Sequence, residues 1–185
     1  MIKKIITFMI ILIAASFSNV YAREIEQRPH WEKQTISVYI PEDNKSAASM
    51  MKSAFQRWQN VSAGHIKFNY LQQGPADIDV IFSDSASSAD SPISNTTISS
   101  NGNSITKSEI NIASENNSFK NLDRDYISKV MQHEVGKALG VPINTKKKTS
   151  IMYIPVSEKQ NIMKIDAIKL FSISEWSYGT RKINK

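Results

Sequence analysis

Alternating hydrophobic and polar positions predict four short β-strands in the first two thirds of the chain. Within each segment, hydrophobic residues occupy every second position and polar residues lie between them, as at Ile36, Val38 and Ile40. A period of two residues is typical of a strand with one buried face. The predicted strands lie around residues 36–40, 66–70, 78–82 and 110–112.

A different period, of three to four residues, predicts two long helices. Hydrophobic residues recur at this spacing over residues 47–61, which gives one continuous buried face. A second helix is expected over about residues 123–139. Asp123 or Asn121 can cap its N-terminus, and Gly140 stands where a left-handed residue commonly ends a helix.

A last helix is expected near the C-terminus. The sequence S-E-K-Q at residues 157–160 resembles a capping box, in which two polar side chains satisfy the first free N–H groups of a helix. The helix that it would open has hydrophobic residues at helical spacing, at Ile162, Ile165, Ile168 and Phe171.

The segment between the third and fourth predicted strands has little periodicity. Residues 83–104 are rich in serine, asparagine and threonine, which indicates a long surface segment with a poor edge strand around residues 93–98. The early helix between two strands fits a crossover onto a mixed sheet. The expected fold class is therefore one α+β domain, with α/β character, in which a long helix packs against the sheet.

The N-terminus has the pattern of a secretory signal peptide. Two lysines precede a run that is almost entirely hydrophobic over residues 5–15, and Ala22 ends a small-residue cleavage pattern. A membrane anchor is the alternative, but the run is short for a bilayer core of about 30 Å. We predict a signal peptide over residues 1–22 and a secreted or extracytoplasmic mature domain over residues 23–185, without membrane association after cleavage.

Charge and composition narrow the possible chemistry. The net charge is +6, and the mild basic excess shows no interleaving with aromatic residues of the kind that indicates nucleic-acid binding. The chain has no cysteine, which excludes thiolate metal sites and a cysteine nucleophile. A transition-metal site would have to use carboxylates and the three histidines, His30, His65 and His133.

The sequence QHEVGKALG, residues 132–140, carries the strongest chemical signal. Residues four apart lie on one helix face, so two histidines at that spacing can bind one metal ion. A glutamate after the first histidine can then act as general base. His133 and Glu134 fit the first two positions, but Lys137 stands where the second histidine would be.

Two further features complete a resemblance to a known family. In metzincins, a glycine follows the second histidine by three residues, and a third histidine follows that glycine by three. Here Gly140 is present and the next position is Ile143. Downstream, S-I-M-Y at residues 150–153 is similar to the methionine turn, with Met152 as its methionine. The chain therefore resembles a matrixin-type metzincin over roughly residues 31–175.

The resemblance implies a fold, a reaction and roles for individual residues. The fold would be the matrixin catalytic domain, with a mixed twisted sheet, an active-site helix, a methionine turn and a C-terminal helix. The family chemistry would be zinc-dependent peptide-bond hydrolysis, with His133 as a metal ligand, Glu134 as general base and Met152 in the supporting turn. Lys137 and Ile143 stand at degenerate ligand positions.

The degenerate positions argue against a tight catalytic zinc. Ligation through a lysine amine needs loss of its proton, which costs about 4.6 kcal/mol at pH 7 for a lysine of ordinary basicity. A protonated amine about 4 Å from a divalent ion would be repelled by roughly 8 kcal/mol at an effective dielectric of 20. His30 and His65 are expected to be locally satisfied rather than to act as ligands. The four acids over residues 83–118 leave calcium open as a cofactor.

Two arrangements of Lys137 are open at this point. Its ammonium can occupy the position of the lost metal, held by Glu134 and the neutral ring of His133. Alternatively, the side chain can extend from the cleft into solvent. A nitrogen pointing away from both partners would contradict the first arrangement.

Three functional hypotheses follow. The favoured one is a secreted matrixin-like pseudoenzyme that binds a peptide or protein in the former substrate cleft, by pairing at a sheet edge. The second is an active zinc metalloendopeptidase with an incomplete or unusual metal site. The third is an unrelated extracellular peptide-binding or structural domain in which the motif is accidental. Whether the chain is an enzyme is therefore undecided by the sequence.

Overall fold

In the part of the chain that the structure describes, a five-stranded mixed sheet packs against two long helices. The computed structural model describes residues 28–114, 119, 121–144, 146–163 and 166. The strand order in the sheet is β2-β1-β3-β5-β4. The elements are β1 (Thr35–Tyr39), α2 (Lys45–Val61), β2 (Lys67–Leu71), β3 (Ile78–Phe82), β4 (Ser94–Asn101), β5 (Ser104–Ile112) and α4 (Arg124–Ala138).

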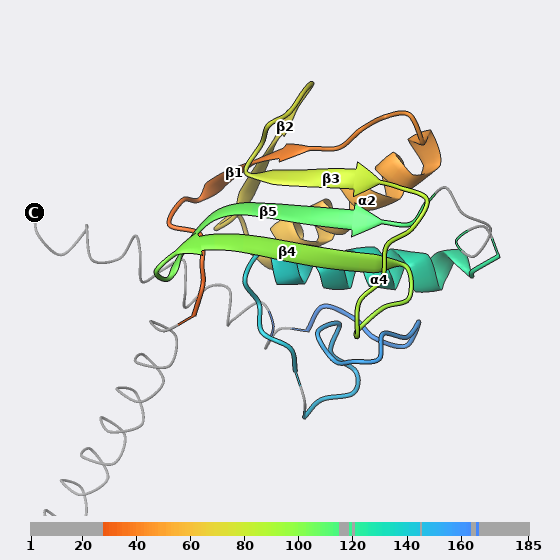
Figure 1. The fold of residues 1–185 in the computed structure, drawn as a ribbon. Helices are drawn as coiled ribbons and strands as arrows, with labels where there is room; N and C mark the ends of the chain where they lie inside the picture. The colour runs from red at the N-terminus through yellow and green to blue at the C-terminus, as the bar shows by residue number, and fades with distance from the viewer. Residues whose placement is uncertain (1–27, 115–118, 120, 145, 164–165, 167–185) are drawn as a thin grey trace, which may run out of the picture.

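Both helices cover the same face of this sheet (Figure 1). Neighbouring strands are parallel except for β4 and β5, which form an antiparallel hairpin at one edge. Helix α2 connects the parallel neighbours β1 and β2, as the predicted crossover requires. The expected α+β class with a mixed sheet is thus confirmed. Neither helix in the described part of the chain is long and hydrophobic enough to cross a membrane.

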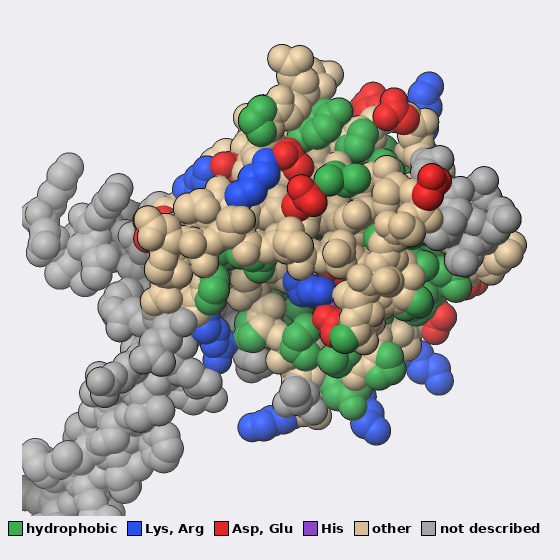
Figure 2. All heavy atoms as spheres, viewed as in Figure 1, with side chains coloured by type: hydrophobic (Ala, Val, Ile, Leu, Met, Phe, Trp, Pro, Cys, Tyr) green, Lys and Arg blue, Asp and Glu red, His purple; other side chains and the backbone are tan. Residues whose placement is uncertain are grey.

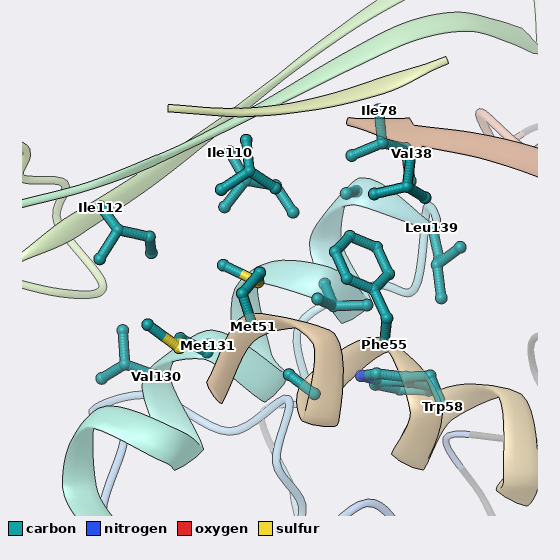
Figure 3. Close-up of a cluster of buried hydrophobic side chains, with 14 of the residues drawn as sticks. Val38, Met51, Phe55, Trp58, Ile78, Ile110, Ile112, Val130, Met131 and Leu139 are labelled. Atoms are coloured by element: carbon teal, nitrogen blue, oxygen red, sulfur yellow. The ribbon is translucent and has the colours of Figure 1, made fainter. Parts of the chain in front are cut away.

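The hydrophobic core lies between the sheet and the helices. Figure 3 shows Val38, Ile78 and Ile110 of the strands facing Met51 and Phe55 of α2 across this layer. These side chains are the inward members of the alternating and helical patterns in the sequence, and burial of each large side chain contributes about 1.5–3 kcal/mol. The core therefore fixes α2 and α4 side by side beneath the sheet.

Helix α4 has the two ends that the sequence predicted. At its start, the Asp123 carboxylate accepts hydrogen bonds from the N–H groups of Asp125 and Tyr126, at 2.6 and 3.4 Å. Beyond its end, Gly140 has a φ of +81°. A Cβ at Gly140 would also lie 2.4 Å from the carbonyl oxygen of Pro29, so no larger side chain fits there.

The edge hairpin is more extensive than the sequence indicated. We expected a poor edge strand around residues 93–98 and a following strand around 110–112, whereas β4 continues to Asn101 and β5 begins at Ser104. Gly102, with a φ of +58°, lies in the turn between them. A register shift between Ser99 and Ser100 interrupts the alternation, and most side chains of β4 are polar, so the usual hydrophobic period is missing.

The predicted start of the last helix at residue 157 is wrong. The Gln160 side chain does accept from the Ser157 N–H at 3.1 Å, as in a capping box. However, its amide also donates to the carbonyls of Tyr153 and Pro155, and Asn161 then forms a bridge with Ser150. Ser157 and Gln160 therefore close a loop and do not begin a helix. Ile162 packs against the core, whereas Ile165, Ile168 and Phe171 lie outside the described residues, as does the segment 1–22.

Candidate functional site

The polar groups of the QHEVGKALG segment lie where α4 passes beneath the edge hairpin. His133 and Glu134 are fully buried, and the Lys137 side chain is 17% exposed. Figure 2 shows a basic and an acidic side chain next to each other in a hollow below β4, with hydrophobic side chains around them. The charged groups of Glu134 and Lys137 thus lie close to the His133 imidazole with little access to water.

The ring of His133 is held in one orientation. Its Nδ1 lies 2.7 Å from the carbonyl oxygen of Ile151, so Nδ1 carries the proton and donates it to this carbonyl. Burial lowers the pKa of His133, and the nearby Lys137 ammonium adds to this, against opposing effects from the Ile151 carbonyl, Glu134 and Asp90. The ring is therefore neutral at pH 7. Its second nitrogen, Nε2, is buried and has no hydrogen-bond partner.

Both carboxylate oxygens of Glu134 have bonding partners. Its Oε1 accepts from the Ser94 hydroxyl at 2.8 Å, and its Oε2 accepts from the Thr96 hydroxyl at 2.5 Å. Oε2 also lies 3.2 Å from the ammonium of Lys137. Because both oxygens are occupied by groups of β4 and α4, this carboxylate ties the helix to the edge strand. The predicted role of general base would need it to face a reacting water instead.

Lys137 pairs with two carboxylates. Its Nζ lies 3.2 Å from Glu134 Oε2 and also 3.2 Å from Asp90 Oδ2. The first contact agrees with one of the two arrangements that the sequence left open, and the alternative, in which the side chain extends into solvent, is not found. The second partner differs from expectation, because it is Asp90 and not the ring of His133. Asp90 also approaches His133 Nε2, at 4.0 Å.

The methionine turn lies directly beneath α4. Met152 is fully buried, its carbonyl accepts from the Asn144 N–H at 2.7 Å, and its N–H donates to the Ser150 hydroxyl at 3.1 Å. A Cβ at Gly136 would lie 2.5 Å from the Met152 sulfur and 2.7 Å from the Trp58 ring. Gly136 therefore permits close approach between the helix, the turn and the core, a requirement that the sequence pattern did not reveal.

Ile143 lines an open pocket next to the charged cluster. The pocket has a volume of about 290 Å³ and is bounded by both hydrophobic and charged residues of four segments. Its lining consists of Arg28, Pro29, Asp90, Thr96, Ile98, Lys137, Gly140, Val141, Pro142 and Ile143. Ile143 is partly buried against the core. A hydrophobic surface thus occupies the position where the resemblance implied a third histidine.

The other two histidines are not gathered at this site. The Nδ1 of His30 lies 2.8 Å from the Arg28 carbonyl, and its backbone bonds with Asn103 and Ile105 near the hairpin turn. Neither His30 nor His65 lines the pocket. Among the described residues, no group of three or more His, Cys, Asp or Glu side chains is arranged to hold a metal ion.

Comparison with known proteins identifies the family. A family model described as matrixin matches residues 30–173, which is most of the chain. This chain belongs to the matrixin family. A search of curated proteins gave no significant match. The matrixin assignment agrees with the mixed sheet, the helix below its edge and the methionine turn.

The residues of this matrixin do not fit the zinc ion on which the family depends. Of the three positions that hold zinc in the family, only His133 offers a nitrogen with a free lone pair, at Nε2. At the second position stands an ammonium that is engaged with two carboxylates, and at the third stands the hydrocarbon side chain of Ile143. Catalytic zinc sites use three protein ligands. The donor set therefore lacks two of the three ligands.

Sequence reasoning missed three residues of this cluster. Asp90 is an isolated acid in a serine-rich segment, and Ser94 and Thr96 belong to a strand of low hydrophobicity. They contact α4 residues that are 38 to 47 positions away along the chain. One signal was available for the two β4 residues. Ser94 and Thr96 stand at alternate positions with Ile98, and alternate residues of a strand point to the same face.

Proposed function

We propose that this matrixin does not catalyse zinc-dependent hydrolysis and instead binds an extended peptide along the former substrate cleft. The observation that carries the proposal is the Lys137 ammonium, which lies within 3.2 Å of both Glu134 and Asp90. It supplies internally the positive charge that the family obtains from zinc. Glu134, the residue expected to act as base, is held by that ammonium and by two hydroxyl groups.

Electrostatic repulsion supports the loss of the metal. A divalent ion about 4 Å from a protonated lysine is repelled by roughly 8 kcal/mol at an effective dielectric of 20. Complete zinc sites have an apparent binding free energy of about 10–16 kcal/mol. A site that lacks two ligands has a much smaller binding free energy, which does not offset the repulsion.

The outer edge of β4, with which no other described strand pairs, supports peptide binding. The Ile93 carbonyl accepts from the Ala113 N–H at 2.9 Å, so the odd-numbered residues of β4 bond with β5 before the register shift. The alternation of an antiparallel pair then directs the N–H and C=O groups of Thr96 and Ile98 toward the open edge. An extended peptide can bond to these groups and place a side chain in the adjacent 290 Å³ pocket.

One observation favours a second candidate, an active metallopeptidase with an unusual site. His133 Nε2 is buried and has no partner, which is the state of a histidine ready to bind a metal. Zinc bound by fewer protein ligands, with Lys137 displaced, would satisfy this nitrogen. The charge and the ligand count of the site favour the first proposal.

The proposal also includes the compartment and the partners of the protein. Matrixins are typically extracellular, and the pattern of residues 1–22 supports export followed by cleavage after Ala22. We propose that the mature domain acts in an extracytoplasmic compartment, with a peptide or protein partner and without nucleic acid. Calcium remains a candidate ligand from the sequence alone.

Metal content and peptide cleavage together test the loss of catalysis. We expect purified residues 23–185 to contain much less than one zinc per chain after equilibration with zinc and desalting. We also expect no cleavage of a broad peptide library beyond that of a Glu134→Ala control. Stoichiometric zinc with cleavage that Glu134→Ala abolishes would establish the second candidate instead.

Peptide binding is tested at the edge strand. Ile98→Pro removes one outward N–H group and leaves the bonding of β4 with β5 in place. Peptides selected from a display library on the wild-type domain should bind this variant at least about tenfold more weakly, the effect of roughly one lost hydrogen bond. Ile98→Thr is the matched control, because it shortens the side chain but keeps the N–H. Equal loss in both variants would show that the side chain, and not the strand edge, binds the peptide.

A further inference from the structure

The 290 Å³ pocket beside β4 combines hydrophobic walls with a partly exposed carboxylate. Its hydrophobic lining comes mainly from β4 and from the segment after α4, at Ile98, Val141, Pro142 and Ile143. Asp90 lines the same pocket, and its side chain is 19% exposed. A long side chain of a bound peptide can therefore contact hydrocarbon along its length and a carboxylate at its end.

The Asp90 carboxylate has bonding capacity that the described residues do not use. Its Oδ2 lies 3.2 Å from the Lys137 ammonium. Within the described part of the chain, no donor is bonded to its second oxygen, Oδ1. An ionised carboxylate has about four acceptor positions on its two oxygens. Oδ1 is therefore able to accept a hydrogen bond from a ligand.

The cluster around Asp90 has an excess of negative charge. Asp90 and Glu134 share the single ammonium of Lys137, which lies 3.2 Å from each carboxylate. Because His133 is neutral at pH 7, the four groups together have a charge of −1. Glu134 and His133 are fully buried, and charges interact more strongly where the effective dielectric is low. The cluster thus favours a cation over a neutral or an acidic group.

We infer that the pocket binds a basic side chain, lysine or arginine, of the extended peptide. This inference rests on the proposed function, because the peptide is the one that pairs with the edge of β4. The cationic end donates to Asp90 Oδ1, and the hydrocarbon stem lies against the walls formed by Ile98 and Val141. Lysine and arginine combine a long hydrocarbon stem with a charged end. The partner is therefore an extended segment that contains a basic residue.

Arg28 provides a second charge with which to test this assignment. It also lines the pocket, so its positive charge opposes a basic ligand and favours an acidic one. Removal of this charge should strengthen the binding of a basic peptide and weaken the binding of an acidic peptide. Asp90 and Arg28 are thus expected to act in opposite directions on the same ligand.

Matched peptides test the inference on the mature domain. Three fluorescein-labelled hexapeptides share the sequence Thr-Val-Thr-X-Val-Thr, in which X is lysine, norleucine or glutamate. Norleucine has the hydrocarbon stem of lysine without its ammonium. Fluorescence anisotropy in about 0.15 M salt gives the three dissociation constants. The readout is the ratio of the Kd of the norleucine peptide to the Kd of the lysine peptide, because a change in the shape of the pocket affects both peptides.

We expect a ratio of at least about ten for the wild type, which is the effect of one hydrogen bond to a charged group. Asp90→Asn should reduce the ratio to about one, because the amide keeps the shape and removes the charge. Asp84→Asn is the matched control, since it removes the same charge from an exposed acid outside the pocket and should leave the ratio high. Arg28→Gln should raise the affinity of the lysine peptide by about two- to fivefold.

The outcomes separate this inference from the proposed function. A ratio of about one in the wild type overturns the basic subsite, as does a ratio that Asp90→Asn leaves unchanged or that Asp84→Asn reduces equally. Tighter binding of the glutamate peptide than of the lysine peptide also overturns it, and assigns the pocket to acidic side chains. In each of these cases, edge binding stands if Ile98→Pro weakens the norleucine peptide. If none of the peptides binds the wild type at up to about 1 mM, edge binding fails, and the inference fails with it.

Discussion

Replacement of Lys137 by methionine is predicted to be among the most destabilising single changes in the domain. Methionine keeps much of the length of the side chain and removes only its charge and donors. Each ion pair at 3.2 Å has a Coulomb energy of about 5 kcal/mol at an effective dielectric of 20, before desolvation is subtracted. Removal of one partner from a buried pair typically costs about 3–5 kcal/mol. Because Glu134 is fully buried, we expect a loss in that range.

Urea denaturation of wild type and variant measures this loss, and a surface ion pair provides the control. Lys33 pairs with Asp77 at 2.5 Å, but its side chain is 49% exposed. Lys33→Met should therefore cost less than about 1 kcal/mol. A double-mutant cycle of Lys137→Met with Glu134→Gln should show a coupling of about 0.5–3 kcal/mol, because the neutral amide no longer needs the ammonium. If Lys137→Met costs no more than Lys33→Met, the ammonium is not a structural substitute for a metal.

Three further perturbations probe the same region. The pKa of His133 is lowered from its ordinary value of 6.5, so the unfolded chain binds this proton more readily. This contribution to stability is present above pH 6.5 and is lost as the pH falls below it. The urea midpoint should therefore decrease between pH 7.5 and 5, and it should decrease less in His133→Gln. Equal decreases in the two proteins would refute the assignment of this pH dependence to His133. Gly136→Ala should lower the free energy of unfolding by about 1–3 kcal/mol through the clash with the Met152 sulfur, and an unchanged melting temperature would contradict the close packing. Thr96→Val removes a hydroxyl donor to buried Glu134 and should cost about 1–3 kcal/mol in urea denaturation, whereas Thr97→Val, on the opposite face of the strand, should cost less.

The parts of the structure that the sequence predicted are those fixed by local periodicity. Strand β3 was expected over residues 78–82 and is found there, because its alternation reflects one buried face. The contact between Glu134 and Lys137 was also predictable, since residues three apart on a helix are neighbours. Such relations depend on a few adjacent residues, so the sequence pattern alone can indicate them.

The contacts that residues distant in the sequence make with Lys137 were not predictable in the same way. Asp90 reaches Lys137 from a segment without periodicity, and nothing in the order of residues places the two together. The same limit explains the error at residue 157, where Gln160 bonds with carbonyls of the preceding loop. A short polar motif specifies which bonds can form, but the surrounding fold decides whether they begin a helix or close a turn.

The sign of the charge in the cluster adds a separate argument against hydrolysis. A zinc ion with three neutral histidines and one glutamate has a total charge of +1, which can stabilise the oxyanion that develops when a peptide bond is attacked. Here Lys137, Glu134 and Asp90 sum to −1, and His133 is neutral at pH 7. A developing oxyanion close to this cluster would be repelled, because both nearby carboxylates share one ammonium. Lys137→His without metal would make the charge −2, so activity is expected from no variant of this site unless an ion is bound.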